Sequence, residues 1–155
     1  MPTYYLDSSA LFKRYRSEPG TEVMDLRFRN KMPGESFVAS EIITLEIESA
    51  AARAVATQET RSLIATFAAS DLLQIESVPI TTALLGGAGQ AARAYGLRAL
   101  DAIHLASALQ IAEAAQAPFL FICSDKELLG AARSAALPTL DPAAANAARL
   151  LRGLR

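Results

Sequence analysis

The chain opens with PTYYLDSSALFKRY, Pro2–Tyr15, and the rest of the fold can be built outward from this stretch. Its apolar run Tyr4–Leu6 is typical of a short strand, and Asp7 follows where that strand would end. Ser8 and Ser9 then lead into an apolar segment that indicates the first turns of a helix. Because open α/β sheets bind ligands outside the carboxyl ends of their strands, Asp7 stands where a functional acid is expected. The alternative is that Asp7 only caps the helix.

The remainder of the chain alternates between strand-like and helix-like patterns. We expect strands at 36–40, 75–80, 119–123 and 138–140. We expect helices at 21–32, 41–58, 60–73 (capped by Thr60), 81–95, 100–115, 126–136 and 142–151. Such alternation predicts an α/β fold with a central parallel sheet and helices on both of its faces. We interpret residues 1–155 as a single domain, since no linker or repeat interrupts the pattern.

Composition narrows the class of protein. The chain has 155 residues, of which 52% are hydrophobic and 20% charged, as in globular domains. No apolar segment is long enough for a membrane span, and the N-terminus lacks the features of a signal peptide. The single cysteine, Cys123, suits a reducing environment, so we expect a cytoplasmic protein. One cysteine and one histidine also exclude a structural zinc site.

The net charge of -1 gives no overall bias toward nucleic acid. Basic residues nevertheless cluster at Lys13, Arg14 and Arg16, and again at 27–31. Such clusters are usually solvated surface, and that interpretation is the default. The alternative is that Lys13, Arg14 and Arg16 contact the phosphates of an RNA held beside an acidic, metal-binding pocket.

Glu46 is a further candidate acid. It lies inside the predicted helix 41–58 and borders the apolar stripe formed by Ile43, Ile47 and Ala50. A carboxylate beside a buried stripe needs a cation or another partner, because burying it alone is costly. The simpler interpretation is a glutamate at the rim of the core that pairs with Arg53 or another base.

Two aspartates complete the set. Asp101 begins the predicted helix 100–115, in line with the buried stripe of that helix, and Asp125 directly follows the apolar run 119–123. The simpler interpretations are a favourable charge at a helix N-terminus for Asp101 and a helix cap for Asp125. His104 follows Asp101 by one helical turn, and we interpret it as a packed, hydrogen-bonded histidine outside the catalytic set.

A cluster of acidic side chains favours the binding of a metal ion. Several carboxylates at one edge repel each other unless they are protonated or bridged by cations. Mg²⁺ and Mn²⁺ prefer oxygen ligands of this kind. An acidic metal cluster on an α/β sheet is suited to hydrolysis of a phosphodiester by metal-activated water.

Four blocks of the sequence, in order, resemble a known family. They are YYLDSSAL, SEIITLEIESA, LDAIHLASAL and ICSDKELLGAA, and together they extend over nearly the whole chain. They are similar to the acidic blocks of PIN-domain ribonucleases, most of all to the VapC-type toxins of bacterial toxin–antitoxin pairs. On this resemblance the acidic positions of the family fall on Asp7, Glu46, Asp101 and Asp125.

The resemblance implies a three-layer α/β/α fold and an endoribonuclease that depends on Mg²⁺ or Mn²⁺, which the four acids would bind. It also implies a homodimer that is inhibited by a small antitoxin. Ser9 matches a hydroxyl residue that hydrogen bonds to the metal ligands, and Ser124 is a candidate for a similar role. Two departures stand out: Cys123 replaces a hydroxyl residue, and Ala135–Leu137 lacks a glycine expected before the last strand, which we interpret as a loop difference.

Two other functions compete with the metal-dependent nuclease. One is a phosphotransferase with Asp7 as nucleophile, but enzymes of the haloacid dehalogenase type carry a second aspartate where this chain has Ser9. The other is a PIN-like scaffold that binds RNA or protein without cutting. The presence of all four acids argues against the scaffold.

Overall fold

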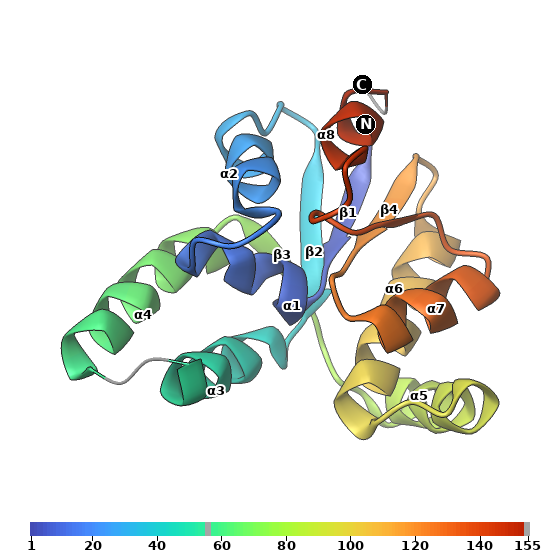
Figure 1. Cartoon of the computed structure of the whole chain (residues 1–155). Helices are drawn as coiled ribbons and strands as arrows, with labels where there is room; N and C mark the ends of the chain where they lie inside the picture. The colour runs from blue at the N-terminus through green and yellow to red at the C-terminus, as the bar shows by residue number, and fades with distance from the viewer. Residues whose placement is uncertain (55–56, 154–155) are drawn as a thin grey trace.

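The strands form one parallel sheet. A computed structural model describes residues 1–54 and 57–153 of the chain. Within these residues five strands lie side by side in the order β3-β2-β1-β4-β5, all parallel (Figure 1). Their bounds are β1 Thr3–Leu6, β2 Ser36–Ser40, β3 Ile75–Val78, β4 Phe119–Ile122 and β5 Thr139–Leu140. The strand from the opening stretch is therefore the central one.

Helices connect the strands. The first is α1, Ser8–Leu11, which continues as a 3₁₀ turn η1 over Phe12–Tyr15. The others are α2 Thr21–Arg29, α3 Ile43–Ala54, α4 Gln58–Leu72, α5 Thr82–Tyr95, α6 Ala99–Ala114, α7 Lys126–Ser134 and α8 Ala147–Gly153. Every connection between neighbouring parallel strands contains at least one helix, as parallel pairing requires.

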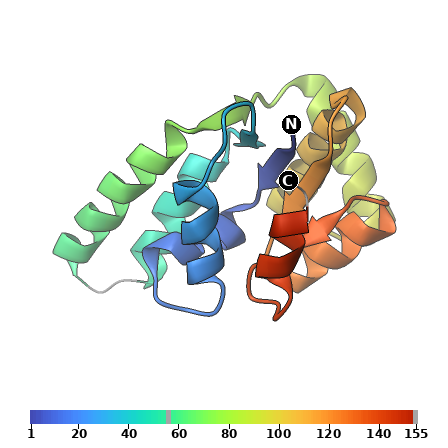
Figure 2. The same ribbon diagram turned by 90° about the horizontal axis from the view of Figure 1, so that it is seen from above.

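Two apolar cores, one on each face of the sheet, make the fold three layers thick (Figure 2). Side chains alternate along a strand, so Tyr4 and Leu6 of β1 pack on one face while Tyr5 packs on the other. The first face carries α1, α2, α3, α4 and α8, and the second carries α5, α6 and α7. This arrangement confirms the predicted α/β/α architecture.

The register of the central strands brings their carboxyl ends level. Leu6 of β1 pairs with Ile122 of β4, and the Asp7 N–H donates to the Ile122 carbonyl at 3.0 Å. The residues that follow the two strands therefore meet at the same edge of the sheet. In Figure 1 this edge lies at the bottom, beside the start of α1 and the start of α7.

Several predicted helix boundaries were wrong. The helix expected at 41–58 ends at Ala54, with 55–56 outside the described residues, and the next helix is capped by Thr57 instead of Thr60, because the Thr57 side chain accepts the Thr60 N–H. The last helix begins at Ala147 and not at residue 142. Asp141 holds the preceding segment in a turn, since its side chain accepts the Ala143 N–H at 2.9 Å.

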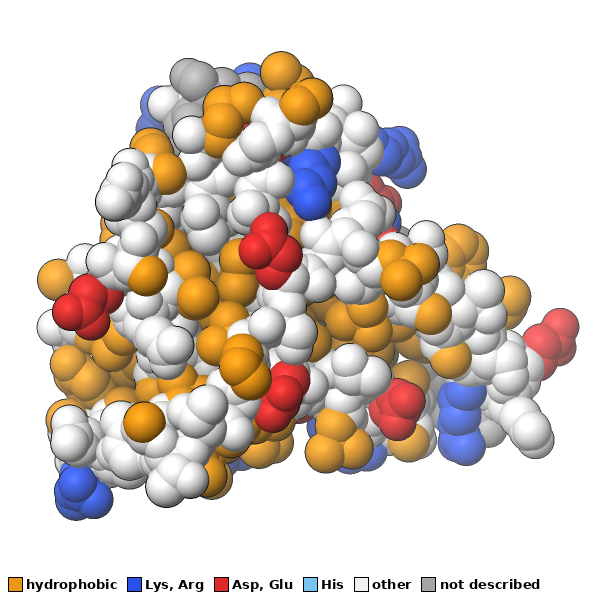
Figure 3. Space-filling model, turned by 180° about the vertical axis from the view of Figure 1, so that it is seen from behind, with side chains coloured by type: hydrophobic (Ala, Val, Ile, Leu, Met, Phe, Trp, Pro, Cys, Tyr) orange, Lys and Arg blue, Asp and Glu red, His pale blue; other side chains and the backbone are white. Residues whose placement is uncertain are grey.

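The face seen from behind carries many hydrophobic side chains over the region of α5 and α6 (Figure 3). A groove of about 480 Å³ between these two helices is lined by apolar residues that include Leu84, Ala91 and Leu109. Across the described part of the chain, no helix combines the length and the apolar character needed to span a membrane.

Candidate active site

Asp7 lies at the exit of β1 and is 3% exposed. Its Oδ2 accepts the Ser9 N–H at 3.0 Å, which caps α1 as the simpler interpretation expected. The same oxygen also accepts hydrogen bonds from the Ser9 hydroxyl and, at 3.4 Å, from the Cys123 thiol. Asp7 is thus a helix cap and also a buried carboxylate fixed from several sides.

The Ser9 hydroxyl joins the ends of the two central strands. It donates to Asp7 and accepts the backbone N–H groups of Ser124, at 2.9 Å, and Asp125, at 3.2 Å. Ser124 contributes its backbone here, while its own hydroxyl donates to Asp141 at 2.9 Å. Ser9 therefore holds the segment that carries Asp125 against the carboxylate of Asp7.

Cys123 takes the place of the hydroxyl residue expected at the end of β4. The side chain is fully buried, and burial, followed by the charge on Asp7, raises the pKa of its thiol. The thiol therefore stays protonated and has a proton to donate to Asp7. The substitution of sulfur for oxygen keeps the hydrogen bond that a hydroxyl would make at this position.

Glu46 reaches the site from α3 and meets His104 of α6. The His104 Nε2 lies 2.5 Å from the Glu46 Oε2 and 3.6 Å from the Asp7 Oδ1. The alternative pairing of Glu46 with Arg53 is not formed, because the Arg53 guanidinium donates to Ser49 instead. The imidazole thus links two of the predicted acids.

His104 is packed and hydrogen-bonded, as the sequence predicted, but sequence reasoning did not identify its acidic partners. Its side chain is completely buried, and burial lowers its pKa, but the charges on Asp7 and Glu46 and the hydrogen bond to Glu46 outweigh burial and raise that pKa above 6.5. The available signal was its spacing, since a residue three after Asp101 lies on the same side of the helix.

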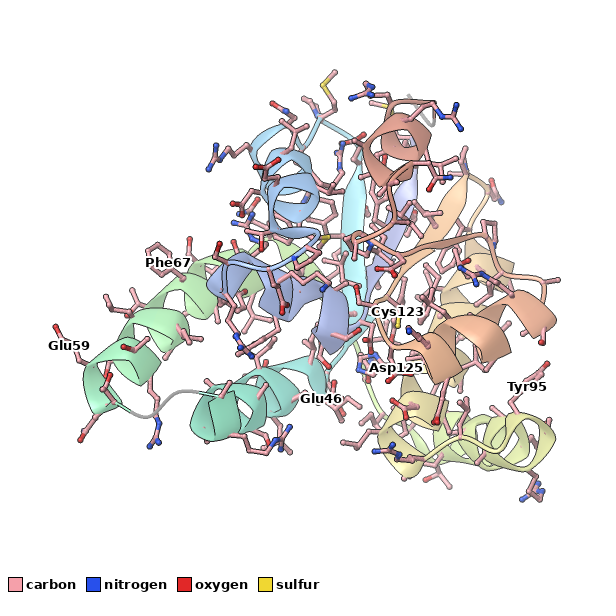
Figure 4. The ribbon with its side chains drawn as sticks, in the orientation of Figure 1. Glu46, Glu59, Phe67, Tyr95, Cys123 and Asp125 are labelled. Carbon is pink, nitrogen blue, oxygen red and sulfur yellow. The ribbon has the colours of Figure 1, made fainter. Side chains whose placement is uncertain are left out.

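Asp101 and Asp125 complete the edge from α6 and α7. Burial, and then the charges on Asp125 and Asp7, raises the pKa of Asp101, because nearby negative charges disfavour its ionised form. Asp125 is exposed, and its Oδ1 accepts the Leu128 N–H at 2.8 Å as a cap for α7. Figure 4 shows Glu46, Cys123 and Asp125 at this end of the sheet.

The chemistry of the four acids suits a hard divalent ion, because carboxylate oxygens are the ligands that Mg²⁺ and Mn²⁺ prefer. As the side chains stand, no three acidic, histidine or cysteine residues in 1–54 and 57–153 are gathered closely enough to hold an ion. His104, between Glu46 and Asp7, keeps these two carboxylates engaged.

The basic residues predicted to contact RNA divide into two groups. Arg14 donates to Asp71 at 2.6 Å and to Asp25 at 2.9 Å, and its guanidinium lies over the Phe28 ring. The largely buried Lys13 pairs with Glu18 at 3.5 Å. These contacts help to hold the N-terminal segment in place, and the expected contact of Lys13 and Arg14 with RNA stays a prediction.

Exposed basic groups remain. Arg16 is exposed and keeps its expected role as a prediction. Arg98, which sequence reasoning passed over, is exposed at the start of α6, and its positive charge acts on Asp101. In the second basic cluster, Arg27 is buried and pairs with Glu35, so it too has a structural role.

A parallel sheet covered by helices, with acidic residues after the carboxyl ends of its strands, places this chain among the α/β proteins that bind their ligands at that edge. The sequence matches the PIN domain family over residues 4–134, and this chain belongs to that family. PIN domains are in general nucleases. No curated protein sequence matches the chain.

Solved structures share the fold. FitAcB from Neisseria gonorrhoeae has a TM-score of 0.62 at 16% identity, covering 92% of this chain and 98% of that one. A toxin–antitoxin complex from Klebsiella pneumoniae has a TM-score of 0.59 at 16% identity, with 92% and 98% covered. VapBC2 from Rickettsia felis, bound to a DNA fragment from its promoter, has a TM-score of 0.58 at 16% identity, with 89% and 97% covered.

Proposed function

We propose that this protein is a divalent-metal-dependent endoribonuclease that acts as the VapC-type toxin of a toxin–antitoxin pair. The observation that carries the proposal is the set of contacts beside the ends of the central strands: His104 lies against the Glu46 and Asp7 carboxylates, and the Ser9 hydroxyl joins Asp7 to the backbone of Asp125. The charges on Asp125 and Asp7 also act, after burial, to raise the pKa of Asp101. Membership of the PIN domain family and likeness to solved toxin–antitoxin proteins support it. The protein would act in the cytoplasm, where its RNA is found.

In this proposal the four carboxylates hold one or two Mg²⁺ or Mn²⁺ ions. Such an ion, when bound, activates water for attack on the phosphodiester and stabilises the charge that develops on the phosphate. The protein contributes the fixed geometry of its oxygens: Ser9 and Cys123 orient the Asp7 carboxylate, and the Ser9 hydroxyl keeps Asp125 beside it. Ser124 supports this arrangement through its backbone and through Asp141.

A protein nucleophile has little support. The Asp7 Oδ2, the candidate in a phosphotransferase, accepts hydrogen bonds from Ser9 and Cys123, and accepting these bonds lowers the reactivity of its lone pairs. The Cys123 thiol is buried and its pKa is raised, which keeps the reactive thiolate from forming. Attack by water fits both features.

RNA would approach along the exposed basic residues next to the acidic edge. Arg98 stands at the start of α6, three residues before Asp101, and it is exposed. We therefore assign a phosphate contact to Arg98 and retain Arg16 as a second, more distant one. Each phosphate neutralised by such a residue releases counterions and makes binding dependent on salt.

An antitoxin would bind in the groove between α3 and α4. This groove encloses about 310 Å³ and is lined mostly by small and branched apolar side chains, among them Ile47, Ala51, Ile64 and Ala68. Glu48 and Arg61 border it, so a partner helix could present an apolar stripe flanked by charges. Solved structures of similar fold contain toxin–antitoxin complexes, which favours an antitoxin as the occupant.

The predicted homodimer is kept as part of the proposal. The hydrophobic face over α5 and α6, with its groove and the exposed Leu85, is where a second copy would pack. Light scattering on the purified protein measures the mass directly. A monomer at tens of micromolar would contradict the dimer without affecting the assignment of the acidic edge.

The nuclease proposal is tested with the variant Asp101→Asn. It preserves shape and removes one negative charge, so RNA cleavage in Mg²⁺ or Mn²⁺ should fall by more than roughly 100-fold, the upper end of what is lost with the outer partners of metal ligands. The matched control is Glu127→Gln on α7, which removes the same charge from an exposed residue near Asp125 and should leave cleavage unchanged. Cleavage that survives both Asp101→Asn and excess EDTA would overturn the metal mechanism. A wild-type protein that binds RNA without cutting it would identify the scaffold.

A further inference from the structure

A buried chain of hydrogen bonds crosses the molecule behind the acidic edge. It begins at the backbone N–H of Ser40, at the end of β2, which donates to the Tyr5 hydroxyl at 3.1 Å. The Tyr5 hydroxyl lies 3.0 Å from the His104 Nδ1. The opposite nitrogen of the ring, Nε2, lies 2.5 Å from the Glu46 carboxylate. This chain of hydrogen bonds thus connects β2, β1, α6 and α3.

The surroundings leave these groups little freedom. Tyr5 and His104 are fully buried, the Tyr5 ring stacks on Phe121 with centroids 5.4 Å apart, and it meets the His104 ring edge-on at 5.9 Å. The imidazole is therefore held by its buried packing and by hydrogen bonds at both nitrogens. Because protein interiors are close-packed, a side chain that is held in place also limits the movement of the groups that it contacts.

The direction of the hydrogen bonds follows from chemistry. An ionised carboxylate can only accept, so the Nε2 of His104 carries the proton that faces Glu46. The Tyr5 oxygen already accepts the Ser40 N–H and keeps its own proton available for Nδ1 when the imidazole is neutral. When the ring is charged, Nδ1 donates to Tyr5 instead. In both forms Nε2–H donates to Glu46.

We infer that Tyr5 and His104 are positioning residues that fix the Glu46 carboxylate in front of Asp7. Glu46 is the acid that most needs such help. It projects from α3, whose start is separated from β2 by a short turn, whereas Asp7 and Asp125 directly follow strands of the sheet. His104 also lies 3.6 Å from the Asp7 Oδ1, so one ring sets the separation of two acids.

The inference rests on the proposed function for its consequence: a correctly separated pair of carboxylates binds a divalent ion more tightly. Outer partners of metal ligands are typically worth 10–100-fold in affinity. We therefore expect His104→Met, which fills space without a donor, to weaken Mn²⁺ binding by roughly that factor. His104→Gln, whose amide N–H₂ reaches toward the place of Nε2, should retain most of the affinity. Tyr5→Phe, which removes only the hydroxyl, should lie between them.

The experiment is Mn²⁺ titration calorimetry on the full chain, with thermal unfolding of each variant in EDTA to confirm folding. The decisive comparison repeats His104→Met in a Glu46→Gln background. If His104 acts through Glu46, the second change costs no more than roughly twofold there, because coupled residues are not additive. An equal loss in both backgrounds, or unchanged or tighter Mn²⁺ binding by His104→Met, would overturn the inference.

A second measurement is independent of metal and of activity. The chain contains one histidine, so the ¹⁵N spectrum of the tag-free, metal-free protein shows a single imidazole. Tyr5→Phe should shift the Nδ1 resonance and Glu46→Gln the Nε2 resonance. Ring resonances that neither variant changes would refute the hydrogen-bond chain. If the wild type binds no Mn²⁺ and cuts no RNA, the proposed function fails, whereas the spectrum still decides whether Tyr5 and His104 hold Glu46.

Discussion

Ala136 has the backbone conformation of a glycine. Its φ is 61°, and it ends α7 with hydrogen bonds from its own N–H to the Arg133 carbonyl and from the Leu137 N–H to the Ala132 carbonyl. This is the left-handed helix end that glycine normally supplies. The missing glycine, interpreted from sequence as a loop difference, therefore leaves the turn intact and strained.

Relief of that strain is the first prediction. Ala136→Gly removes a Cβ that costs roughly 1–2 kcal/mol in the left-handed region, partly offset by the greater freedom of glycine in the unfolded chain. We expect the free energy of unfolding, measured with urea, to rise by up to about 1 kcal/mol. The control is the reverse substitution at a similar position, Gly96→Ala, where φ is 69° and an added Cβ meets nothing within 4 Å. It should lower stability by a similar amount, and a stabilising Gly96→Ala would contradict the argument.

His104 gives the second residue-scale prediction. Its pKa is raised in the fold by Asp7, Glu46 and Asp101, and Tyr5 also faces the ring. A group whose folded pKa is raised stabilises the fold below its unfolded pKa, near 6.5, and that contribution is lost as the pH rises through the folded value.

The metal-free protein should therefore lose stability as the pH rises above 6.5 and through the raised pKa of His104 in the fold. The measurement is the urea midpoint in EDTA, taken as the difference between wild type and His104→Gln so that other titrating groups cancel. A difference that is constant or grows with pH would show that His104 is not charged in the fold.

At the scale of elements, Arg14 ties three segments together. From η1 it donates twice to Asp71 at the end of α4, with 2.6 and 2.9 Å contacts, and once to Asp25 of α2. The Tyr15 hydroxyl also donates to Asp71 at 2.9 Å. Asp71 is 4% exposed, so its charge depends on these donors.

Two substitutions of basic residues distinguish a role in stability from a role in RNA binding. Arg14→Leu leaves Asp71 buried without its cation and should lower the free energy of unfolding by about 3 kcal/mol, the usual cost of breaking such a pair. Arg98→Ala, at an exposed position, should keep stability and reduce the slope of log affinity for RNA against log salt by about 1. The two variants are compared by urea unfolding and by fluorescence anisotropy over a salt series. A stable Arg14→Leu protein with weakened RNA binding would reverse the assignments.

At the scale of the whole molecule, the proposed function is divided between two regions. The acidic edge lies at the carboxyl ends of the strands, and the apolar groove lies between α3 and α4 on one side of it. α3 belongs to both, since it carries Glu46 to the site and Ile47 and Ala51 to the groove. A partner helix in the groove would thus rest on the helix that positions an acid.

The groove is tested with Ala65→Arg, an exposed position of α4 that lines it. We expect this variant to lose binding to the proposed antitoxin by at least roughly 10-fold, since a long charged side chain would occupy the contact. Ser62→Arg, exposed on the same helix outside the groove lining, is the matched control and should bind normally. Binding is followed by calorimetry with the purified partner, and RNA cleavage by both variants alone should match wild type. Equal binding by both would place the partner on another surface.

The sequence by itself determined the architecture and the candidate acids. Short apolar strand-like runs alternating with capped helices are local patterns, and a parallel sheet brings the residues after its strands to one edge, so Asp7 and Asp125 could be predicted together. Glu46 and Asp101 followed from helical spacing and from the resemblance to PIN domains. Helix ends were less accurate, because competing caps such as Thr57 and Thr60 differ by small local free energies.

Only the tertiary structure decided which partners these residues take. Arg14 and Arg16 belong to the same basic cluster in the sequence. Arg14 nevertheless pairs with Asp71, because the end of α4 packs against η1, whereas Arg16 stays exposed. His104 read as an ordinary core residue, and it gained its role only when β1 placed Tyr5 on one side of the ring and α3 placed Glu46 on the other. Strand and helix patterns arise from contacts between near neighbours in the chain, whereas the hydrogen bonds and charges of a site join residues as far apart as 46 and 104, whose meeting depends on the packing of every layer between them.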